Sequence, residues 1–218
     1  MPIERGKNVV FVHIPRTGGT SIEILLGMTG AENLWGFAPI PSWGTNCSPQ
    51  HFTFQDLQRN LPDKFLSRAF KFAFVRNPWD RFVSEFEWRR RHWNSRSSSS
   101  PRVYDNRDLE SLDAFTRLLR LPPDRRLDSS IGLDSHLETQ TSFLIDPLGN
   151  IAVDFVGRFE KFETDLRSVL ECLGIVANAI PHANGGPIRD YRAYYSRDTQ
   201  EAVRRFYSDD IERFGYSF

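Results

Sequence analysis

The stretch VVFVHIPRTGGTS, residues 9–21, decides most of the fold prediction. It opens with a short apolar run, residues 9–14, whose β-branched composition is typical of a buried strand in a parallel sheet. Gly18–Gly19 end the strand, and Thr20 and Glu23 have the spacing of a capping box that opens a helix. The order strand, glycine turn, helix predicts an α/β fold.

A second strand and helix follow the same pattern. Residues 70–75 are apolar and predict another buried strand, after which Asn77 and Pro78 favour the start of a helix. Alternating strands and helices imply a mainly parallel central sheet flanked by helices. Periodicity and turn residues predict a short helix capped by Thr53 and Asp56, a helix over 109–121, a hairpin or two strands around a turn within 143–156, a helix over 160–173 and a last helix over 199–214.

Length and composition bound the answer further. A chain of 218 residues with 39% hydrophobic residues favours one domain, residues 1–218, in which the serine-rich segment 94–108 is expected to be a mobile loop. The net charge is zero, which argues against a general nucleic-acid binder. No apolar run approaches the ~20 residues that span a bilayer, and no signal peptide is recognisable, so we expect a cytoplasmic protein.

The glycine turn, residues 16–21, has the composition of an anion-binding site. Glycines let a backbone approach a ligand, and N–H groups at a helix start favour negative charge. Arg16 adds a cation, and Thr17, Thr20 and Ser21 add hydroxyl donors. These groups predict a cradle for phosphate or sulfate, with an ordinary βα turn as the alternative. The turn is not a Walker A loop, because no lysine precedes Thr20.

The end of the second strand offers a further anion site. Arg76 stands where an α/β sheet presents its carboxyl edge to ligands, and Ser84 lies on the helix that follows. Two strand ends with phosphate-binding chemistry suggest a ligand that carries two anionic groups.

Both motifs are similar to those of a known family. Residues 13–21, HIPRTGGTS, resemble the 5′-phosphosulfate motif of the sulfotransferases, and residues 76–84 resemble their 3′-phosphate motif. The ending over 209–216 is similar to that of many bacterial members, and the nearest resemblance is to carbohydrate-type sulfotransferases and their short bacterial relatives. The resemblance implies a single domain of the P-loop NTPase type.

The resemblance also implies a sulfuryl donor, 3′-phosphoadenosine-5′-phosphosulfate (PAPS), with the desulfonated nucleotide PAP as product. By motif match, Arg76 and Ser84 would hold its 3′-phosphate, and the 5′-phosphosulfate would be held by Arg16, Thr17, Gly18, Gly19, Thr20 and Ser21. Most relatives carry lysine where this chain has Arg16, so the charge is kept while the reach differs.

Roles in catalysis follow partly from chemistry and partly from the resemblance. Arg16 could stabilise the departing phosphate, and this arrangement requires no metal. Carbohydrate-type members place a catalytic histidine in the stretch around His51, which makes His51 the candidate base, with a helix-entry histidine as the alternative. His136 is a candidate acceptor residue. Arg89 belongs to an arginine cluster that is either a solvated helix end or a site for acidic acceptors.

Three functions remain open on these observations. The first is sulfuryl transfer from PAPS to an acceptor hydroxyl by in-line displacement, with a carbohydrate or a small metabolite as acceptor. The second is a P-loop-like kinase or nucleotide-binding protein, against which the missing Walker lysine counts. The third is a catalytically idle PAP-binding protein. The sequence encodes neither the acceptor nor the oligomeric state.

Overall fold

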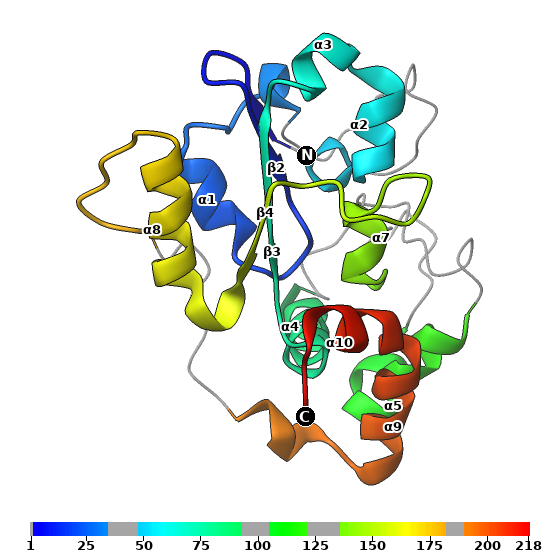
Figure 1. Ribbon diagram of the computed structural model, residues 1–218. Coiled ribbons are helices and arrows are strands. Elements are labelled where there is room, and N and C mark those ends of the chain that lie inside the picture. Colours follow the sequence, from blue (N-terminus) through cyan, green and yellow to red (C-terminus); the bar gives the residue numbers. More distant parts are fainter. Residues whose placement is uncertain (1, 35–47, 93–104, 122–135, 182–189) are drawn as a thin grey trace. The chain divides into compact units, whose positions relative to one another are not determined.

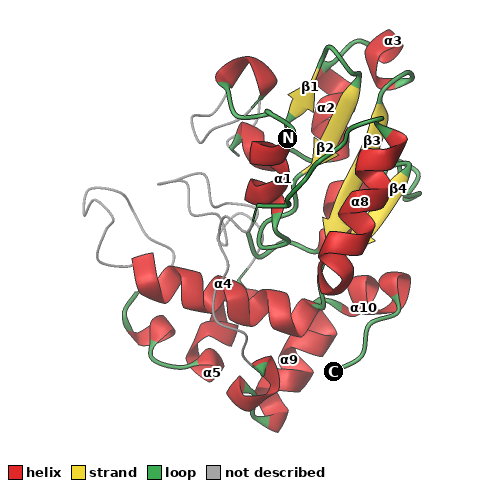
Figure 2. Cartoon of the chain, turned by 90° about the vertical axis from the view of Figure 1, so that its left-hand side faces the viewer, coloured by secondary structure: helices red, strands yellow, loops and turns green. Residues whose placement is uncertain are grey.

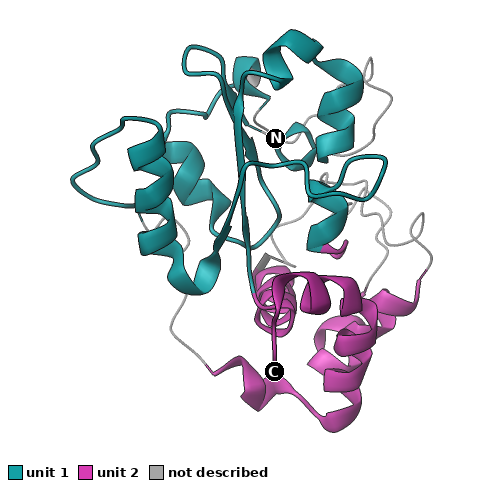
Figure 3. Ribbon diagram, in the orientation of Figure 1, with its two compact units in different colours: residues 1–76, 140–187 teal, residues 77–139, 188–218 magenta. Residues whose placement is uncertain are grey.

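The computed structural model describes residues 2–34, 48–92, 105–121, 136–181 and 190–218. The chain divides into two compact units, each made of two segments (Figure 3). Unit 1 comprises residues 1–76 and 140–187, and unit 2 comprises residues 77–139 and 188–218.

A four-stranded sheet forms the centre of unit 1. Its strands are β1 (Ile3–Glu4), β2 (Val9–Val12), β3 (Phe70–Val75) and β4 (Phe155–Arg158), which pair in that order (Figure 2). β1 pairs antiparallel with β2, while β2, β3 and β4 are parallel. The register places Val12 beside Ala73 and Val75 beside Arg158. The carboxyl ends of β2 and β3 therefore reach the same edge of the sheet.

Helices cover both faces of this sheet (Figure 1). On one face lie α1 (Gly19–Leu25) and α8 (Phe162–Cys172), whose Ile22 and Leu166 pack in one core cluster with Phe72. On the other lie α2 (Phe54–Asn60) and α7 (Gln140–Leu144). The remaining helical segments of unit 1 are α3 (Asp63–Leu66) and the 3₁₀ turns Ala31–Asn33, Pro49–His51 and Phe159–Lys161.

Within the described residues, unit 2 is helical. Its helices are α4 (Pro78–His92), α5 (Leu112–Phe115), α9 (Arg197–Phe206) and α10 (Ser208–Phe214), with 3₁₀ turns at Arg107–Leu109, Thr116–Arg120 and Tyr191–Tyr194. The apolar face of α4 packs against α5 and α9, and the Phe82 and Phe115 rings lie 5.1 Å apart. This gives unit 2 a core of its own.

The structure confirms the predicted α/β fold of the P-loop NTPase type, with a mainly parallel sheet between helices. Two local predictions are also confirmed. Thr53 and Asp56 form the capping box of α2, and Asn77 Oδ1 accepts a hydrogen bond from Trp79 N–H at the start of α4. One domain over residues 1–218 stays a prediction.

Two predicted elements are wrong near the glycine turn and the hairpin. Thr20 and Glu23 make no capping box, because Gly18, in the left-handed conformation, precedes α1 without a side-chain cap and Glu23 is buried. Phe143 and Leu144 belong to α7 instead of a strand. The hairpin reduces to one isolated bridge between residues 145 and 151, and β4 pairs parallel with β3.

Three other segments differ in extent. The helix predicted over 199–214 divides at Tyr207, whose φ of −100° and ψ of 26° interrupt the helical repeat between α9 and α10. The helix predicted over 109–121 is reduced to α5 and a 3₁₀ turn. Of the predicted loop 94–108, residues 94–104 lie outside the described residues, and residues 107 and 108 begin a 3₁₀ turn.

Candidate active site

The glycine turn after β2 leaves no room for side chains at two successive positions. Gly18 has a φ of 87°, in the left-handed region that favours glycine, and a Cβ there would lie 2.7 Å from the Phe162 ring. A Cβ on Gly19 would overlap the imidazole of His13. Both positions therefore require glycine, and the bare backbone lets the Phe162 and His13 rings pack directly against the turn.

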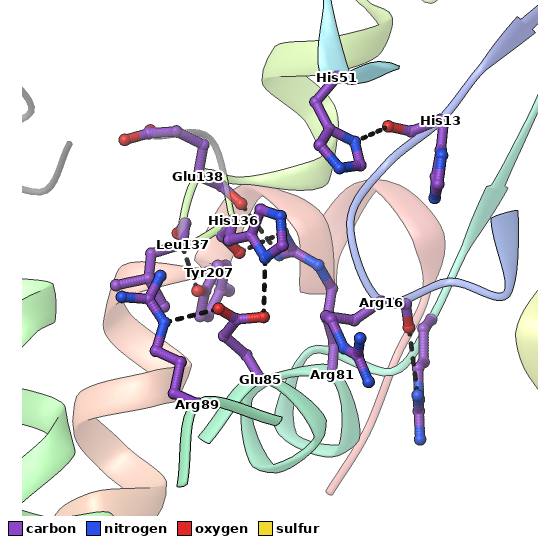
Figure 4. A network of polar contacts seen from close by, with 11 residues as sticks. His13, Arg16, His51, Arg81, Glu85, Arg89, His136, Leu137, Glu138 and Tyr207 are labelled. Carbon is purple, nitrogen blue, oxygen red and sulfur yellow. Dashed lines mark hydrogen bonds and ion pairs between the residues drawn. The ribbon is translucent and has the colours of Figure 1, made fainter. Parts of the chain in front are cut away.

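Arg16 joins this turn to the second motif. It has a positive φ of 69°, a conformation that costs ~1–2 kcal/mol for an L-residue. In this conformation its carbonyl oxygen accepts a hydrogen bond from Nη1 of Arg76 at 3.1 Å (Figure 4). The structure thus brings together two of the predicted site residues, 60 positions apart, at one edge of the sheet.

Arg76 is held on its backbone and on its side chain. Its N–H donates to Oε1 of Gln140 at 2.8 Å, and its carbonyl accepts from Nε2 of the same amide at 2.9 Å. Its guanidinium carbon lies 4.0 Å from the centre of the Phe159 ring, a cation–π distance. These contacts fix the direction in which the positive charge leaves β3.

The hydroxyl groups of the glycine turn have different surroundings. The Thr17 side chain is buried, and its Oγ1 donates to the carbonyl of Ile14 at 2.8 Å. Ser21 is buried on α1, whereas Thr20 is half-buried. Because the Thr17 hydroxyl already serves the backbone, its predicted part in anion binding rests on its N–H.

His51 lies in the 3₁₀ turn Pro49–His51 and is 4% exposed. Its Nδ1 is 2.9 Å from the carbonyl oxygen of His13, and its ring lies edge-on to the His13 ring with centroids 4.6 Å apart. A carbonyl oxygen can only accept, so Nδ1 of His51 carries the proton. The neutral ring then has its lone pair on Nε2, the form that a general base requires.

A buried carboxylate supports this region. Glu23 is fully buried on α1, and its Oε1 lies 2.6 Å from Nδ1 of His13. Nε2 of Gln50 donates to both oxygens of Glu23, at 3.0 and 2.7 Å. The same carboxylate therefore binds His13, whose ring packs against Gly19, and Gln50, the neighbour of His51.

The two candidate acceptor residues, His136 and Arg89, contact the same carboxylate in unit 2. Glu85 accepts from Nε of Arg89 at 2.6 Å, and its other oxygen lies 3.0 Å from Nδ1 of His136 (Figure 4). Arg89 is 1% exposed, so the interpretation of a solvated helix end is wrong for this residue, because Glu85 one turn earlier compensates its charge within the protein.

Further contacts position the segment that carries His136. Arg81 donates to the carbonyls of His136 and Glu138, both at 2.9 Å, and the Tyr207 hydroxyl donates to that of Leu137 at 2.9 Å. Ser84, predicted to share the 3′-phosphate with Arg76, lies half-buried on α4. Arg76 and Ser84 belong to different units, and their shared role stays a prediction.

Sequence reasoning missed four residues that build this site: Glu23 as a buried anchor, Gln50, Gln140 and Phe159. Glu23 has the spacing of a capping residue, and no local pattern distinguishes the other three from ordinary polar or aromatic residues. Their partners are far away in the sequence, 64 residues in the case of Gln140 and Arg76. Within the described ranges, no three His, Cys, Asp or Glu side chains gather in a group that could hold a metal ion.

Fold and site together define an α/β protein whose sheet edge carries a glycine turn and two arginines, an arrangement suited to anionic ligands. The sequence model of the sulfotransferase family matches residues 2–217, and the chain belongs to this family. No curated protein matches the sequence. No helix within the described ranges combines the length and the apolar composition that a membrane crossing requires.

Proposed function

We propose that this chain transfers a sulfuryl group from PAPS to the hydroxyl of an acceptor. Membership of the sulfotransferase family supports sulfuryl transfer and disfavours the kinase alternative. The single observation that carries the choice of donor is the hydrogen bond from the Arg76 guanidinium to the backbone carbonyl of Arg16, which joins the second motif to the glycine turn. A donor with several anionic groups fits this arrangement.

The residues present fit such a donor. Arg16 to Ser21 would hold the 5′-phosphosulfate, with the backbone N–H groups at the start of α1 as donors. Arg76, fixed by Gln140 and Phe159, would hold the 3′-phosphate together with Ser84. Guanidinium groups suit phosphate and sulfate because their planar N–H donors bind two oxygens at once.

In this proposal PAPS supplies the sulfuryl group and a phosphate leaving group. Nε2 of His51 accepts the proton of the attacking hydroxyl, in the tautomer that the hydrogen bond to His13 selects. The guanidinium of Arg16 stabilises the negative charge that develops on the departing phosphate. The protein otherwise acts by positioning, as in phosphoryl transfer.

The acceptor is the second substrate of the proposed reaction. A carbohydrate or a small metabolite, handled in the cytoplasm, is our proposal from the resemblance of the sequence. His136 is the proposed acceptor residue, and Arg89, which is nearly inaccessible, would act by holding Glu85 against His136. A catalytically idle PAP-binding protein is the alternative that only turnover can test.

Ligand-induced stabilisation tests the donor. PAP at 100 times its Kd adds ~2.7 kcal/mol to the folded state, which raises the melting temperature by roughly 5–10 °C for a chain of this size. We expect this shift without Mg²⁺, and we expect labelled PAPS to transfer its label in an acceptor screen. Stabilisation by ATP with Mg²⁺, and none by PAP, would contradict the proposal.

A further inference from the structure

The Glu23 carboxylate is the most deeply buried acidic group of the region around the glycine turn, at 0% exposure. Burying a carboxylate is costly unless hydrogen bonds replace its water. Here His13 contacts it at 2.6 Å and Gln50 at 2.7 and 3.0 Å. These contacts offset the cost, and they place one charge between two elements, since His13 follows β2 and Gln50 lies in the 3₁₀ turn of His51.

His13 reaches both parts of the proposed site. Its imidazole lies where a Cβ of Gly19 would be, so the ring packs directly against the glycine turn. Its carbonyl oxygen accepts the Nδ1 proton of His51 at 2.9 Å (Figure 4). A displacement of His13 would therefore change the shape of the turn. It would also break the hydrogen bond that selects the tautomer of His51.

We infer that Glu23 is a positioning residue that holds the glycine turn and the base His51 in register. It acts through His13 on the turn, and through His13 and Gln50 on His51. This inference rests on the proposed function, which assigns the roles of turn and base. Glu23 itself need not touch either substrate.

The contacts of Glu23 allow an experiment that separates the effect of its negative charge from the effect of its volume. Gln50 offers N–H donors to both carboxylate oxygens, an arrangement that an amide at position 23 cannot accept without turning Gln50. Glu23→Gln preserves the volume of the side chain and removes the charge. The double variant Glu23→Gln with Gln50→Glu exchanges the two groups, so that His13 can donate to the new amide oxygen and the amide can donate to the new carboxylate.

The experiment compares the wild type with the single and the double variant, and with Glu163→Gln as a control that removes an exposed carboxylate of unit 1. Two quantities are measured: the Kd of PAP by calorimetry, and the ring ¹⁵N shifts of His51, which report its tautomer. We expect Glu23→Gln to weaken the binding of PAP at least tenfold. We also expect His51 to become a mixture of its two neutral tautomers. In the double variant, the Kd of PAP should return to within about threefold of the wild-type value. His51 should return to the wild-type tautomer.

An affinity of Glu23→Gln within twofold of the wild type, with an unchanged His51 tautomer, overturns the inference. So does a double variant that is no better than the single one. If Glu23→Gln does not fold, Gln50→Leu takes its place, with the same loss of affinity expected and the same twofold limit. A wild type that binds no PAP refutes the proposed function, and the His51 tautomer alone then decides on Glu23.

Discussion

The side-chain amide of Gln140 pairs with the backbone of Arg76 in both directions, accepting from its N–H at 2.8 Å and donating to its carbonyl at 2.9 Å. Gln140 is fully buried at the start of α7. The amide thus does for Arg76, the first residue beyond β3, what a neighbouring strand does within a sheet. The direction of the Arg76 guanidinium depends on a residue 64 positions away.

Gln140→Leu should weaken the binding of PAP about tenfold, because the backbone of Arg76 loses both hydrogen bonds to the amide and the Arg76 side chain becomes less well oriented. Arg76→Ala should cost ~2 kcal/mol of binding free energy or more, the loss of a charged hydrogen bond. The two effects should not add, since Gln140 acts through Arg76. Calorimetry with PAP on the single and double variants measures this coupling.

Gln55→Leu is the matched control, because the Gln55 amide also donates to a backbone carbonyl within unit 1. It should leave PAP affinity unchanged. Full additivity of Gln140→Leu and Arg76→Ala would show that Gln140 supports the fold independently of Arg76.

Phe159→Leu should lower the affinity for PAP several-fold, since the ring 4.0 Å from the guanidinium carbon of Arg76 is removed. Phe159→Tyr keeps the aromatic face and should retain the affinity. Phe65→Leu removes a half-buried ring beneath Arg5, away from the glycine turn, and serves as control. If the leucine and tyrosine variants at position 159 bind equally, the cation–π contact has no part in donor binding.

Arg16→Gly should separate stability from activity. Glycine tolerates the φ of 69°, so relief of strain offsets the greater freedom of the unfolded chain, and the urea midpoint should equal or exceed that of the wild type. Turnover should fall by ~10²–10³, because the group that stabilises the leaving phosphate is lost. Arg16→Lys restores the charge and should retain much of the activity. A lysine variant as inactive as the glycine variant would show that charge is not the role of Arg16.

His51→Ala should leave the affinity for PAP nearly intact and reduce kcat by ~10² or more, the usual contribution of a positioned base. In the wild type the rate should fall on the acid side, because a protonated imidazole has no lone pair to accept the hydroxyl proton. The measurement is kcat against pH for both proteins with an acceptor from the screen. If the alanine variant keeps the wild-type rate, the base is another residue, and His136 is the next to replace.

The pair Asp108–Arg117 in unit 2 predicts a pH-dependent stability. Burial raises the pKa of Asp108, but two 2.6 Å hydrogen bonds from Arg117 and one from the backbone of Asp105 outweigh it, so the pKa lies below its ordinary value. A carboxyl with a lowered pKa contributes stability above its ordinary pKa and loses it as the pH falls through the folded value. The stability advantage of the wild type over Asp108→Asn should therefore be present at pH 7 and shrink below about pH 4. Urea unfolding of both proteins across this range measures it, and a pH-independent difference would contradict the assignment.

Local signals predicted the elements that depend on neighbours in the sequence. The capping box of Thr53 and Asp56 is formed by residues three apart, and the start of α4 at Asn77 and Pro78 likewise needs no distant partner. The glycine turn was predicted because a strand, two glycines and a helix follow one another. These signals also sufficed for the parallel pairing of β2 and β3.

Distant contacts explain what the sequence did not reveal. Glu23 has the spacing of a capping residue, yet its carboxylate hydrogen-bonds to the buried His13 and Gln50 instead. The carboxylate needs these partners because it is buried away from water. Phe143 and Leu144 look like strand residues, but they fill the core as part of α7. The burial of Arg89 likewise depends on its ion pair with Glu85, which the arginine-rich composition of the helix end does not indicate.

The fit of the His13 imidazole against Gly19 has a consequence for how this sequence can evolve. Any side chain at position 19 would need the space that the ring occupies, so a substitution there becomes tolerable after position 13 has become smaller. A smaller residue at position 13 would in turn leave the Glu23 carboxylate without its histidine. The three positions are therefore expected to change together along a lineage, as a linked set, while the exposed surface of α8 drifts residue by residue.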